Sequence, residues 1–575
     1  MRVHRFPRSR SGLTASLIAV IALLAPAAVE AAHPEAVRGT GGAVASAAPA
    51  ATEAGLEVLK AGGNAADAAV ATALALAVVH PQAGNLGGGG FAVLRFGDEA
   101  EALDFRETAP ARADRDMYLD DNGEPIADAS LIGPRAAGVP GTPAGLYELH
   151  RRYGKLPWPR VVAPAIRLAR DGFIVTRRLA FELAESSDLL QRYPETAAVW
   201  LAEGEPPAAG TTMRLPQLAT TLQAYADRGP AAITEGPAAA AIELAAHRYG
   251  GILRAADLAA YHPVWRRPVQ FEAYGWSIAS MPLPSSGGII LGETLGILQR
   301  LDWASSPPFG ADRAHLLAEA WRRAYADRFL LGDPRTTQAD ASDLLAPAWL
   351  DLRASQIKPK KATDSDKVET WSEERARESA ETTHLSVVDA GGNAVALTTT
   401  LNGRFGCGLL VPGVGFLLNN EMDDFATAPG RPNAYGLIQG EANAVAPGKR
   451  MLSSMAPTIA WRGAEVLVLG SPGGSRIPTA TAQVLTALIV DGDGLQEAVD
   501  RPRIHHQWMP DVLVAETDAL SPETAAELER RGYELESVRA IGEVHAVRFS
   551  STGLVEAAQD PRGPGAAGVV RPAVD

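Results

Sequence analysis

The residues in this chain best suited to covalent chemistry are threonines that lie close together in residues 381–402. Thr382 and Thr400 each carry a hydroxyl, and Asn402 adds an amide two positions after Thr400. A threonine hydroxyl is a weak nucleophile unless a base stands beside it, and the threonine's own α-amine can be that base once it is free. A nucleophile of this kind requires a cut between Glu381 and Thr382. Threonines are also common in ordinary strands, because branched side chains suit a pleated surface, so the pattern needs support from the rest of the chain.

A β-hairpin is the element that must position these groups. Two runs of β-branched residues are joined by a short Asp/Gly/Asn loop, which is typical of a hairpin. If the loop spans 390–393, Asp389 pairs with Ala394, and residues 400–401 then lie beside residues 382–383. This register predicts that two hydroxyls and an amide meet at one end of the hairpin.

The length and composition are those of a large globular protein with many turns. The chain has 575 residues, of which 46% are hydrophobic, and its 56 glycines and 41 prolines show no collagen-like period.

The formal net charge of the chain is −14 at pH 7, so we expect no nucleic-acid binding through its overall charge. The single cysteine, Cys407, cannot form an intramolecular disulfide and is expected to be a small buried residue.

The N-terminus has the pattern of an export signal. Arginines in the first ten residues precede an apolar run, residues 13–29, and small residues then favour cleavage after Ala31 or Ala32. We therefore predict a signal peptide at residues 1–31 and a periplasmic or secreted protein, with a retained N-terminal anchor as the alternative. The apolar run is short for a membrane span, so no stable span is expected once the signal is removed.

Several segments of the first half carry clear structural signals. Asn64 can cap a helix over 65–79, which is almost wholly apolar and therefore expected to be buried. The glycine cluster at 84–90 precedes a strand over 91–96 and lacks the Lys-Ser/Thr of a phosphate-binding loop, which favours close backbone packing near a site. A further strand-like run ends at Arg106. The planar guanidinium group of Arg106 could bind a substrate carboxylate through two hydrogen bonds or pair with another charge.

The most polar stretch of the chain, residues 358–380, ends immediately before Glu381. Its Lys, Asp, Glu, Ser and Arg content predicts a solvated, flexible segment. A cleavage point needs an accessible chain on at least one side, so this segment is compatible with a cut before Thr382.

A group of carboxylates follows a buried strand in the second half. Glu421, Asp423 and Asp424 could be metal ligands, a general acid and base, or a pocket for an ammonium group. No histidine or further carboxylate stands at ligand spacing, so a metal site is disfavoured, and no cofactor is expected. The Pro/Gly/Asn-rich loop 429–440, which contains Tyr435, could serve as a mobile cover.

Two further motifs flank a strand hairpin. Ser453 and Ser454 precede it, and Gly473 and Gly474 follow it at a turn into a helix expected over 478–490. Backbone N–H groups of glycines at such a strand-to-helix turn are suitable donors to an oxyanion.

In their order along the chain these motifs resemble those of the γ-glutamyltransferase (γ-glutamyltranspeptidase) family of N-terminal-nucleophile hydrolases. The resemblance runs from about Gly39 to the C-terminus, and motifs of this length in this order are highly specific. The matching segments are residues 105–110, 284–288, 382–389, 418–425, 452–458, 470–476 and 560–562.

The resemblance implies an α/β (α+β) protein, a four-layer αββα sandwich made as a precursor that cuts itself. Residues 32–381 would be the large subunit and residues 382–575 the small one, together forming a heterodimer. Thr382 would attack the Glu381 carbonyl during maturation and later a γ-glutamyl amide such as glutathione, with its α-amine as the base. Water, or an amino acid or peptide acceptor, would then take the γ-glutamyl group.

The resemblance also assigns roles around the nucleophile. Thr400 would hydrogen-bond the nucleophilic hydroxyl, Gly473 and Gly474 would form the oxyanion hole, and Tyr435 would belong to a lid. The substrate's α-carboxylate would be bound by Arg106, Ser453 and Ser454. Its α-ammonium would be bound by Asn402, Glu421 and Asp424. The family accepts Glu or Gln at the position of Glu421, so the acid here agrees with the assignment.

Two other interpretations stay open from the sequence. A cephalosporin or glutaryl acylase would share this fold and nucleophile, but a glutaryl group lacks the α-ammonium that Glu421 and Asp424 would bind. An uncleaved exported protein that binds γ-glutamyl peptides would use the same pocket, but it would give Thr382 and Thr400 no role.

Overall fold

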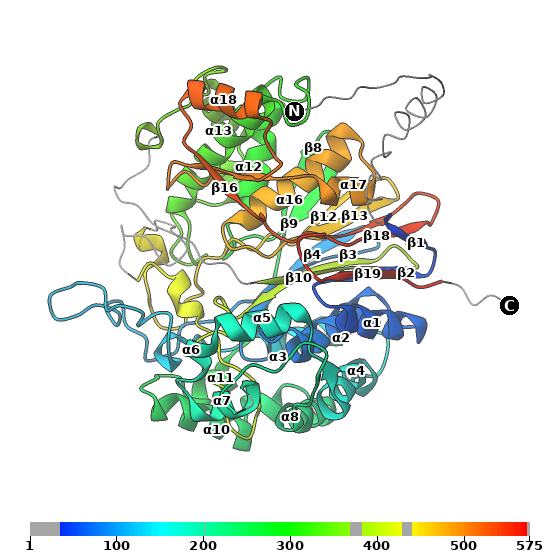
Figure 1. Ribbon diagram of the computed structural model, residues 1–575, viewed down its shortest axis with the longest axis vertical. Helices are drawn as coiled ribbons and strands as arrows, with labels where there is room; N and C mark the ends of the chain where they lie inside the picture. The colour runs from blue at the N-terminus through cyan, green and yellow to red at the C-terminus, as the bar shows by residue number, and fades with distance from the viewer. Residues whose placement is uncertain (1–34, 202, 369–381, 428–439, 572–575) are drawn as a thin grey trace, which may run out of the picture. The chain divides into compact units, whose positions relative to one another are not determined.

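Figure 1 shows the protein as a computed structural model, which describes residues 35–201, 203–368, 382–427 and 440–571. Ala36–Asp575 form one unit and Met1–Glu35 another, and every element below belongs to the former. The predicted signal peptide at 1–31, the cleavage residue Glu381 and the lid residue Tyr435 lie outside the described residues.

Two seven-stranded antiparallel sheets form the middle of this unit. In spatial order the first sheet contains β1 (Val37–Gly39), β18 (Val555–Ala558), β17 (His545–Phe549), β13 (Glu465–Gly470), β12 (Thr458–Arg462), β9 (Trp276–Ser280) and β8 (Val269–Ala273). The second contains β19 (Ala566–Val569), β2 (Gly42–Ser46), β10 (Thr383–Asp389), β11 (Ala394–Thr400), β3 (Gly89–Phe96), β4 (Glu99–Phe105) and β7 (Val264–Arg266).

Helices cover the outer face of each sheet, so the layers follow one another as helix, sheet, sheet, helix (Figure 1). Against the second sheet lie α1 (Pro49–Lys60), α2 (Ala65–Val79) and α3 (Thr142–Tyr153), with α4 (Trp158–Asp171) and α8 (Pro216–Arg228) packed nearby. Against the first sheet lie α12 (Gly287–Gln299), α16 (Arg476–Thr486) and α17 (Leu495–Asp500), with α13 (Ala311–Asp327), α15 (Pro347–Ser355) and α18 (Pro522–Arg531) beyond them. The predicted αββα sandwich is confirmed.

Shorter elements complete the unit. The remaining helices are α5 (Arg177–Glu185), α6 (Ser187–Leu190), α7 (Pro194–Trp200), α9 (Ala231–Thr234), α10 (Gly236–Arg248), α11 (Ala255–Ala260) and α14 (Ala341–Leu344). Two smaller sheets are also present. One contains β14 (Ile504–His505), β15 (Leu513–Glu516) and β16 (Leu535–Val538), and the other contains β5 (Phe173–Ile174) and β6 (Thr212–Met213). Within the described residues, no helix combines the length and the apolar character needed to cross a membrane.

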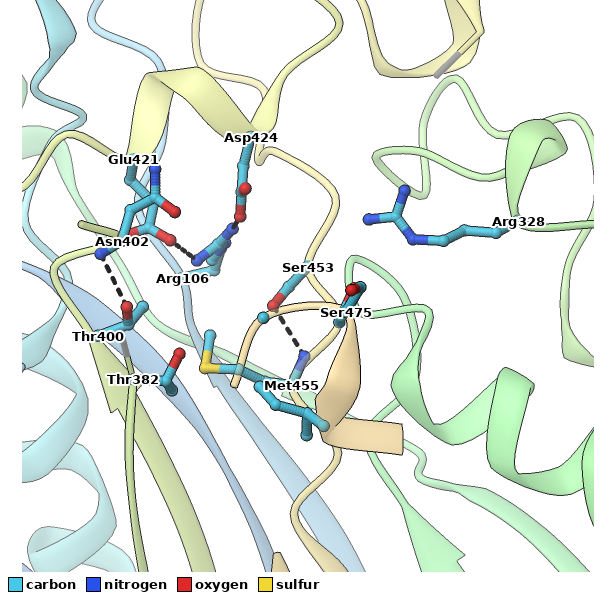
Figure 2. Close-up of a pocket in the computed structure, with 13 residues that line it drawn as sticks. Arg106, Arg328, Thr382, Thr400, Asn402, Glu421, Asp424, Ser453, Met455 and Ser475 are labelled. Atoms are coloured by element: carbon cyan, nitrogen blue, oxygen red, sulfur yellow. Dashed lines mark hydrogen bonds and ion pairs between the residues drawn. The ribbon is translucent and has the colours of Figure 1, made fainter. Parts of the chain in front are cut away.

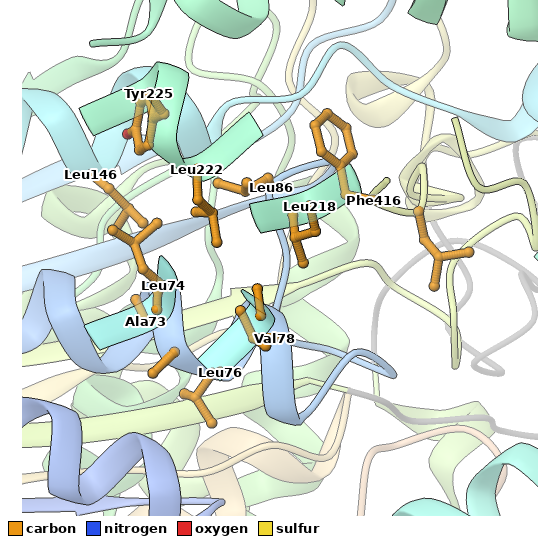
Figure 3. Packing of buried hydrophobic residues seen from close by; sticks show 14 of the residues in the cluster. Ala73, Leu74, Leu76, Val78, Leu86, Leu146, Leu218, Leu222, Tyr225 and Phe416 are labelled. Carbon is orange, nitrogen blue, oxygen red and sulfur yellow. The ribbon is translucent and has the colours of Figure 1, made fainter. Parts of the chain in front are cut away.

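Helix α2 shows how the sequence builds the core. It has the bounds predicted from the sequence and begins after Asn64, whose side chain accepts hydrogen bonds from the backbone N–H groups of Ala66 and Asp67. All of its residues are buried, because apolar positions cover its whole circumference. Figure 3 shows Leu74 of this helix in one apolar cluster with Leu146 of α3 and Leu222 of α8.

The hairpin of β10 and β11 differs from the predicted register by one residue. Val388, rather than Asp389, pairs with Ala394. Asp389 is the last residue of β10 and lies opposite Asn393: its N–H donates to the carbonyl of Asn393 at 3.0 Å, and its carboxylate accepts from the N–H of Gly391 at 2.8 Å. These bonds close a loop of three residues, one fewer than predicted.

The shift changes which threonines face one another. Thr383 pairs with Thr399, and continuing the register by one residue sets Thr382 opposite Thr400. The prediction of Thr400 beside Thr383 was therefore wrong by one position, but the meeting of hydroxyls at this end of the hairpin is preserved.

The polar stretch at 358–380 is in part a packed segment, contrary to the prediction. Ser365 is buried, its hydroxyl donates to the carbonyl of Trp508 at 2.7 Å, and the indole of Trp508 donates to the Ser365 carbonyl at 3.0 Å. Internal hydrogen bonds thus hold part of residues 358–368, most of whose other polar side chains are exposed, while residues 369–380 lie outside the described part of the chain.

Two smaller predictions are confirmed. Cys407 is buried, and burial raises the pKa of its thiol to about 12. In the glycine cluster, a Cβ at Gly88 would lie 2.1 Å from the carbonyl oxygen of Thr400, so this position allows the close approach of two backbones beside the hairpin.

Candidate active site

Thr382 and Thr400 line one pocket at the end of the hairpin (Figure 2). Thr382 precedes β10 and is 8% exposed, while Thr400 ends β11 and is 3% exposed. The pocket holds about 350 Å³ including its open mouth, which is within the range of small-molecule sites. Its lining includes most of the residues to which the resemblance assigned a role: Arg106, Thr382, Thr400, Asn402, Glu421, Asp424, Ser453, Ser454 and Gly474.

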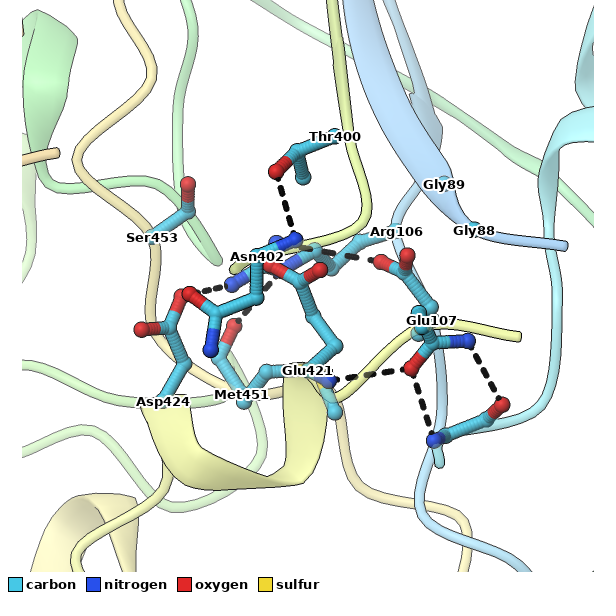
Figure 4. A network of polar contacts seen from close by, with 12 residues as sticks. Gly88, Gly89, Arg106, Glu107, Thr400, Asn402, Glu421, Asp424, Met451 and Ser453 are labelled. Carbon is cyan, nitrogen blue, oxygen red and sulfur yellow. Dashed lines mark hydrogen bonds and ion pairs between the residues drawn. The ribbon is translucent and has the colours of Figure 1, made fainter. Parts of the chain in front are cut away.

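Arg106 forms the charged end of this pocket. It directly follows β4 and is buried, and its two terminal nitrogens donate to Glu421 and to Asp424 (Figure 4). Its Nε also donates to the carbonyl of Met451 at 3.3 Å. The two acids begin and end a single 3-10 turn, η4 (Glu421–Asp424). The guanidinium and the carboxylates therefore compensate one another's charge away from water.

The third acid of the cluster has a different role. Asp423 accepts a hydrogen bond from the hydroxyl of Ser130 at 2.6 Å and is not among the residues that line the pocket. Of the three predicted acids, only Glu421 and Asp424 face the site.

Burial controls the protonation of the acids around Arg106. Burial raises the pKa of Glu421 well above its usual value, and the attraction of Arg106 opposes this without cancelling it. The same cause raises the pKa of Asp424. The neighbouring Glu107 lies 3.7 Å from Arg106, and burial raises its pKa to about 7. These groups therefore take up protons at a higher pH than exposed carboxylates do.

Asn402 links the hairpin to the acidic turn. Its backbone has a φ of 71°, a left-handed conformation that asparagine adopts more readily than most residues. The Asn402 N–H donates to Oγ1 of Thr400 at 2.7 Å, and its side-chain amide donates to the carbonyl of Asn420 at 3.0 Å. Both bonds fix the amide beside Glu421 (Figure 4).

Ser453 and Ser454 line the pocket from the segment that precedes β12. The N–H of Ser453 donates to the carbonyl of Pro284 at 2.8 Å, and its hydroxyl accepts from the N–H of Met455 at 3.1 Å. The hydroxyl of Ser454 is buried and has no hydrogen-bond partner among the described residues. Ser454 thus presents an unused polar group to the pocket.

Gly473 and Gly474 form the turn before α16. Their φ angles are 130° and 55°, which favour glycine. Gly474 lines the pocket, whereas Gly473 is not among the lining residues. Helix α16 begins two residues before the predicted start and ends at Thr486, and its positive N-terminal end lies next to this turn.

Four lining residues were missed by sequence reasoning. They are Arg328, Met455, Ser475 and Ile477. Met455 and Ser475 lie within the matching segments 452–458 and 470–476 but were given no role, and Ile477 directly follows the second of these segments. Arg328 lies outside all of the matching segments, and no sequence signal tied it to the site.

The described residues contain no group of three or more His, Cys, Asp or Glu side chains arranged to hold a metal ion. What the pocket does contain is a hydroxyl pair, a turn with glycine N–H groups, and a cluster of opposite charges. Such a set can bind a zwitterion and stabilise an oxyanion.

The chain matches known proteins over most of its length. Residues 51–570 match the family described as Gamma-glutamyltranspeptidase. A glutathione hydrolase proenzyme from Escherichia coli strain K12 is 45% identical over 534 residues, which cover 92% of this chain and 91% of that protein.

Solved structures share the fold. A cephalosporin acylase from Bacillus halodurans has a TM-score of 0.81 at 26% identity, covering 94% of this chain and 97% of that one. The gamma-glutamyltranspeptidase of Helicobacter pylori has a TM-score of 0.55 at 37% identity, covering 56% of this chain and 93% of that one.

Proposed function

Because the chain belongs to the gamma-glutamyltranspeptidase family, we propose that Thr382 is the nucleophile with which it cleaves γ-glutamyl amide bonds. The activity is that of the family: the chain is a self-processing enzyme that hydrolyses glutathione and transfers γ-glutamyl groups. The arrangement that best supports Thr382 is its place opposite Thr400, in a pocket that also contains Arg106, Glu421 and Asp424.

Maturation is the first reaction of Thr382. Its hydroxyl attacks the carbonyl carbon of Glu381, the C–N bond breaks, and the chain is joined through an ester while the α-amine of Thr382 becomes free. Water then hydrolyses the ester, which leaves a carboxylate on Glu381 and restores the hydroxyl. The freed amine, with an ordinary pKa of about 7.7–8.0, can act as a general base near neutral pH.

Amide cleavage repeats this chemistry on the substrate. The amine of Thr382 takes the hydroxyl proton as the oxygen attacks the γ-carbonyl, and the N–H groups at Gly473 and Gly474 bind the resulting oxyanion. The proton then passes to the departing amine, and a γ-glutamyl ester remains on Thr382. Water releases glutamate, or the amino group of an amino acid or peptide acceptor forms a new γ-glutamyl amide.

The charged end of the pocket suits the zwitterionic head of a γ-glutamyl group. Arg106 would bind its α-carboxylate together with Ser453 and Ser454, and Glu421 and Asp424 would bind its α-ammonium together with Asn402. Substrate binding on this scheme exchanges the ion pairs of Arg106 for equivalent pairs with the ligand, so buried charges stay compensated throughout.

The subunits produced by a cut before Thr382 would stay together. Strands β10 and β11 would belong to the small subunit, residues 382–575, but they pair with β2 and β3 of the large subunit, residues 32–381. One continuous sheet therefore joins the two products, which supports a heterodimer.

Denaturing gel electrophoresis of purified protein tests the nucleophile. We expect wild type to give two bands, a Thr382→Ala variant one uncut band, and a Thr382→Ser control two bands again. N-terminal sequencing of the smaller wild-type band should begin at Thr382. A first residue elsewhere, or a cut Thr382→Ala variant, would show that Thr382 is not the nucleophile.

Export is a separate proposal, which rests on the pattern in residues 1–31. Expression of the full chain in a Gram-negative host, followed by release of the periplasm, should place the enzyme there with a mature N-terminus near Ala32. Deletion of residues 1–31 should leave it in the cytoplasm. Retention of the full-length chain in the membrane fraction would instead favour an uncleaved anchor.

A further inference from the structure

A second guanidinium reaches the pocket from the side away from Arg106. Arg328 begins η2 (Arg328–Leu330), directly after α13, and it is only 4% exposed. It lines the same pocket as Thr382, and Figure 2 shows its side chain extended toward the pocket across from Arg106 and Asp424. The family resemblance gave this residue no role.

Arg328 lacks the charge compensation of the other buried arginines near it. Arg322 and Arg323, which lie six and five residues earlier in α13, are paired with Glu319 at 3.1 and 2.9 Å. Arg328 has no carboxylate within 4 Å among the described residues; its Nε donates to the hydroxyl of Ser286 at 3.1 Å, and its Nη1 has no hydrogen-bond partner there.

A buried cation without a counter-ion is costly, so this arrangement requires an explanation. Burial lowers the pKa of Arg328 to about 10, which still leaves the side chain charged at neutral pH. The acid that acts on it most strongly is Asp424, and that carboxylate is already hydrogen-bonded to Arg106. The positive charge of Arg328 is therefore in excess on this side of the pocket.

The hydroxyl of Ser454 lines the same pocket and is also buried without a partner among the described residues. The pocket thus has unused donors beyond those of Arg106, and a guanidinium is best satisfied by an anion with several acceptor oxygens. A carboxylate has that chemistry and a size that fits a small pocket.

We propose that Arg328 binds a substrate carboxylate and so forms a second anion-binding position in the pocket, beyond Arg106. This inference rests on the proposed γ-glutamyl activity. Glutathione has two carboxylates, one on the γ-glutamyl head and one at the C-terminus of the departing dipeptide, and either could supply the ligand. Peptide acceptors likewise carry a C-terminal carboxylate.

Two variants separate charge from hydrogen bonding at this position. Arg328→Lys keeps the positive charge but loses the planar fork, whereas Arg328→Gln can still hydrogen-bond Ser286 but has no charge. Each is assayed after confirming self-cleavage and measuring the melting temperature. The donors are glutathione, glutathione with a C-terminal amide, and γ-glutamyl-p-nitroanilide, which carries only the α-carboxylate.

The pattern of kcat/KM identifies the carboxylate. If Arg328 binds the C-terminal carboxylate, Arg328→Gln should lower kcat/KM for glutathione at least about tenfold and leave the amide and the anilide within about twofold. If it binds the α-carboxylate, all three donors should fall together. In both cases Arg328→Lys should retain much more activity than Arg328→Gln.

A purely structural role gives a different result. If Arg328 only holds Ser286, both variants should lower the melting temperature and reduce kcat for all donors to the same degree. That outcome, or kcat/KM values unchanged in Arg328→Gln, overturns the proposal. Failure of the underlying activity is distinguishable, because wild type itself would then turn over none of the three donors.

Discussion

Oγ1 of Thr400 accepts a hydrogen bond from the backbone N–H of Asn402 at 2.7 Å. A hydroxyl can accept a hydrogen bond at its oxygen and also donate its own proton. The register of the hairpin places Thr382 opposite Thr400, so the Thr400 hydroxyl is suited to donate to the Thr382 oxygen. This bond would hold the nucleophile in one rotamer and stabilise negative charge as it develops.

Replacement of the Thr400 hydroxyl should therefore slow catalysis more than it disturbs the fold. We expect Thr400→Val, which keeps the branched shape, to reduce kcat per processed active site about 10- to 100-fold, as for a lost hydrogen bond to a charged group. Thr400→Ser keeps the hydroxyl and is the matched control, for which we expect less than about a threefold loss. Equal losses in the two variants would assign the effect to packing.

The raised pKa values of Glu421 and Asp424 predict an unusual pH dependence of substrate binding. An ammonium group is held by ionised acids, and burial makes these two acids protonate at a higher pH than ordinary carboxylates. KM for a γ-glutamyl anilide should therefore rise as the pH falls, beginning above the usual carboxylate range. Measurement of KM between pH 8 and pH 4.5 checks this, with kcat followed separately to account for the amine of Thr382.

Glu421→Gln identifies the group responsible for that rise. The amide keeps the size of the side chain and an acceptor oxygen but cannot be protonated in this range. We expect an active variant in which the increase in KM at low pH begins at a lower pH. An unchanged profile would assign the effect to Asp424 or to Glu107, whose pKa burial raises to about 7.

The sequence predicted local structure well wherever neighbouring residues determine it. Helix α2 has the predicted bounds because a capping Asn64 and an apolar run set its limits. The hairpin register was wrong because the Asp389 carboxylate binds loop N–H groups and shortens the turn. A side-chain contact of this kind has no signature in residue periodicity.

The assembly of the pocket depends on contacts between residues far apart in the chain. Arg106 meets Glu421 across more than three hundred residues, and only a family resemblance could bring them together in advance. Arg328 was missed because it belongs to no motif of the family, and its neighbours in the sequence resemble those of any amphipathic helix. Its significance is that no described neighbour provides a counter-ion, which is a property of the folded protein and not of the local sequence.

The acids at Glu421 and Asp424 also predict donor preference. A γ-glutamyl group brings an α-ammonium that compensates both carboxylates, whereas a glutaryl group of similar length has none and leaves them beside an apolar chain. We expect γ-glutamyl-p-nitroanilide to exceed glutaryl-p-nitroanilide in kcat/KM by at least about 100-fold, which corresponds to about 2.7 kcal/mol for loss of a buried charged contact. A preference for the glutaryl compound would instead support an acylase.

Gly470 is a point at which the two sheets approach closely. A Cβ at this position would lie 2.4 Å from the ring of His384, which is buried in β10 two residues after Thr382. Gly470→Ala should therefore lower the free energy of unfolding by about 1–3 kcal/mol and slow self-cleavage. Gly494→Ala, whose Cβ would meet only Glu497 at 4.0 Å, is the control and should do neither in denaturation and time-course gels.

Buried histidines predict loss of stability in weak acid. Burial lowers the pKa to about 3 for His80 and His505 and to about 4 for His506 and His545. Unfolded histidine has a pKa of about 6.5. As the pH falls below that value the unfolded chain gains protons that the native state excludes, so each histidine lowers the free energy of unfolding by about 1.4 kcal/mol per pH unit until its native pKa is reached.

His545 allows this effect to be isolated from the buried carboxyl groups, whose raised pKa values act in the opposite direction. Neither of its ring nitrogens has a hydrogen-bond partner among the described residues, and its Nε2 lies 3.7 Å from the carboxylate of Glu543, so His545→Gln removes a titrating group and this one contact without breaking a hydrogen bond of the ring. In an uncut Thr382→Ala background, urea denaturation between pH 7.5 and pH 4.5 should show a slope of stability against pH that is smaller by about one proton. An unchanged slope would mean that His545 becomes protonated within the folded protein.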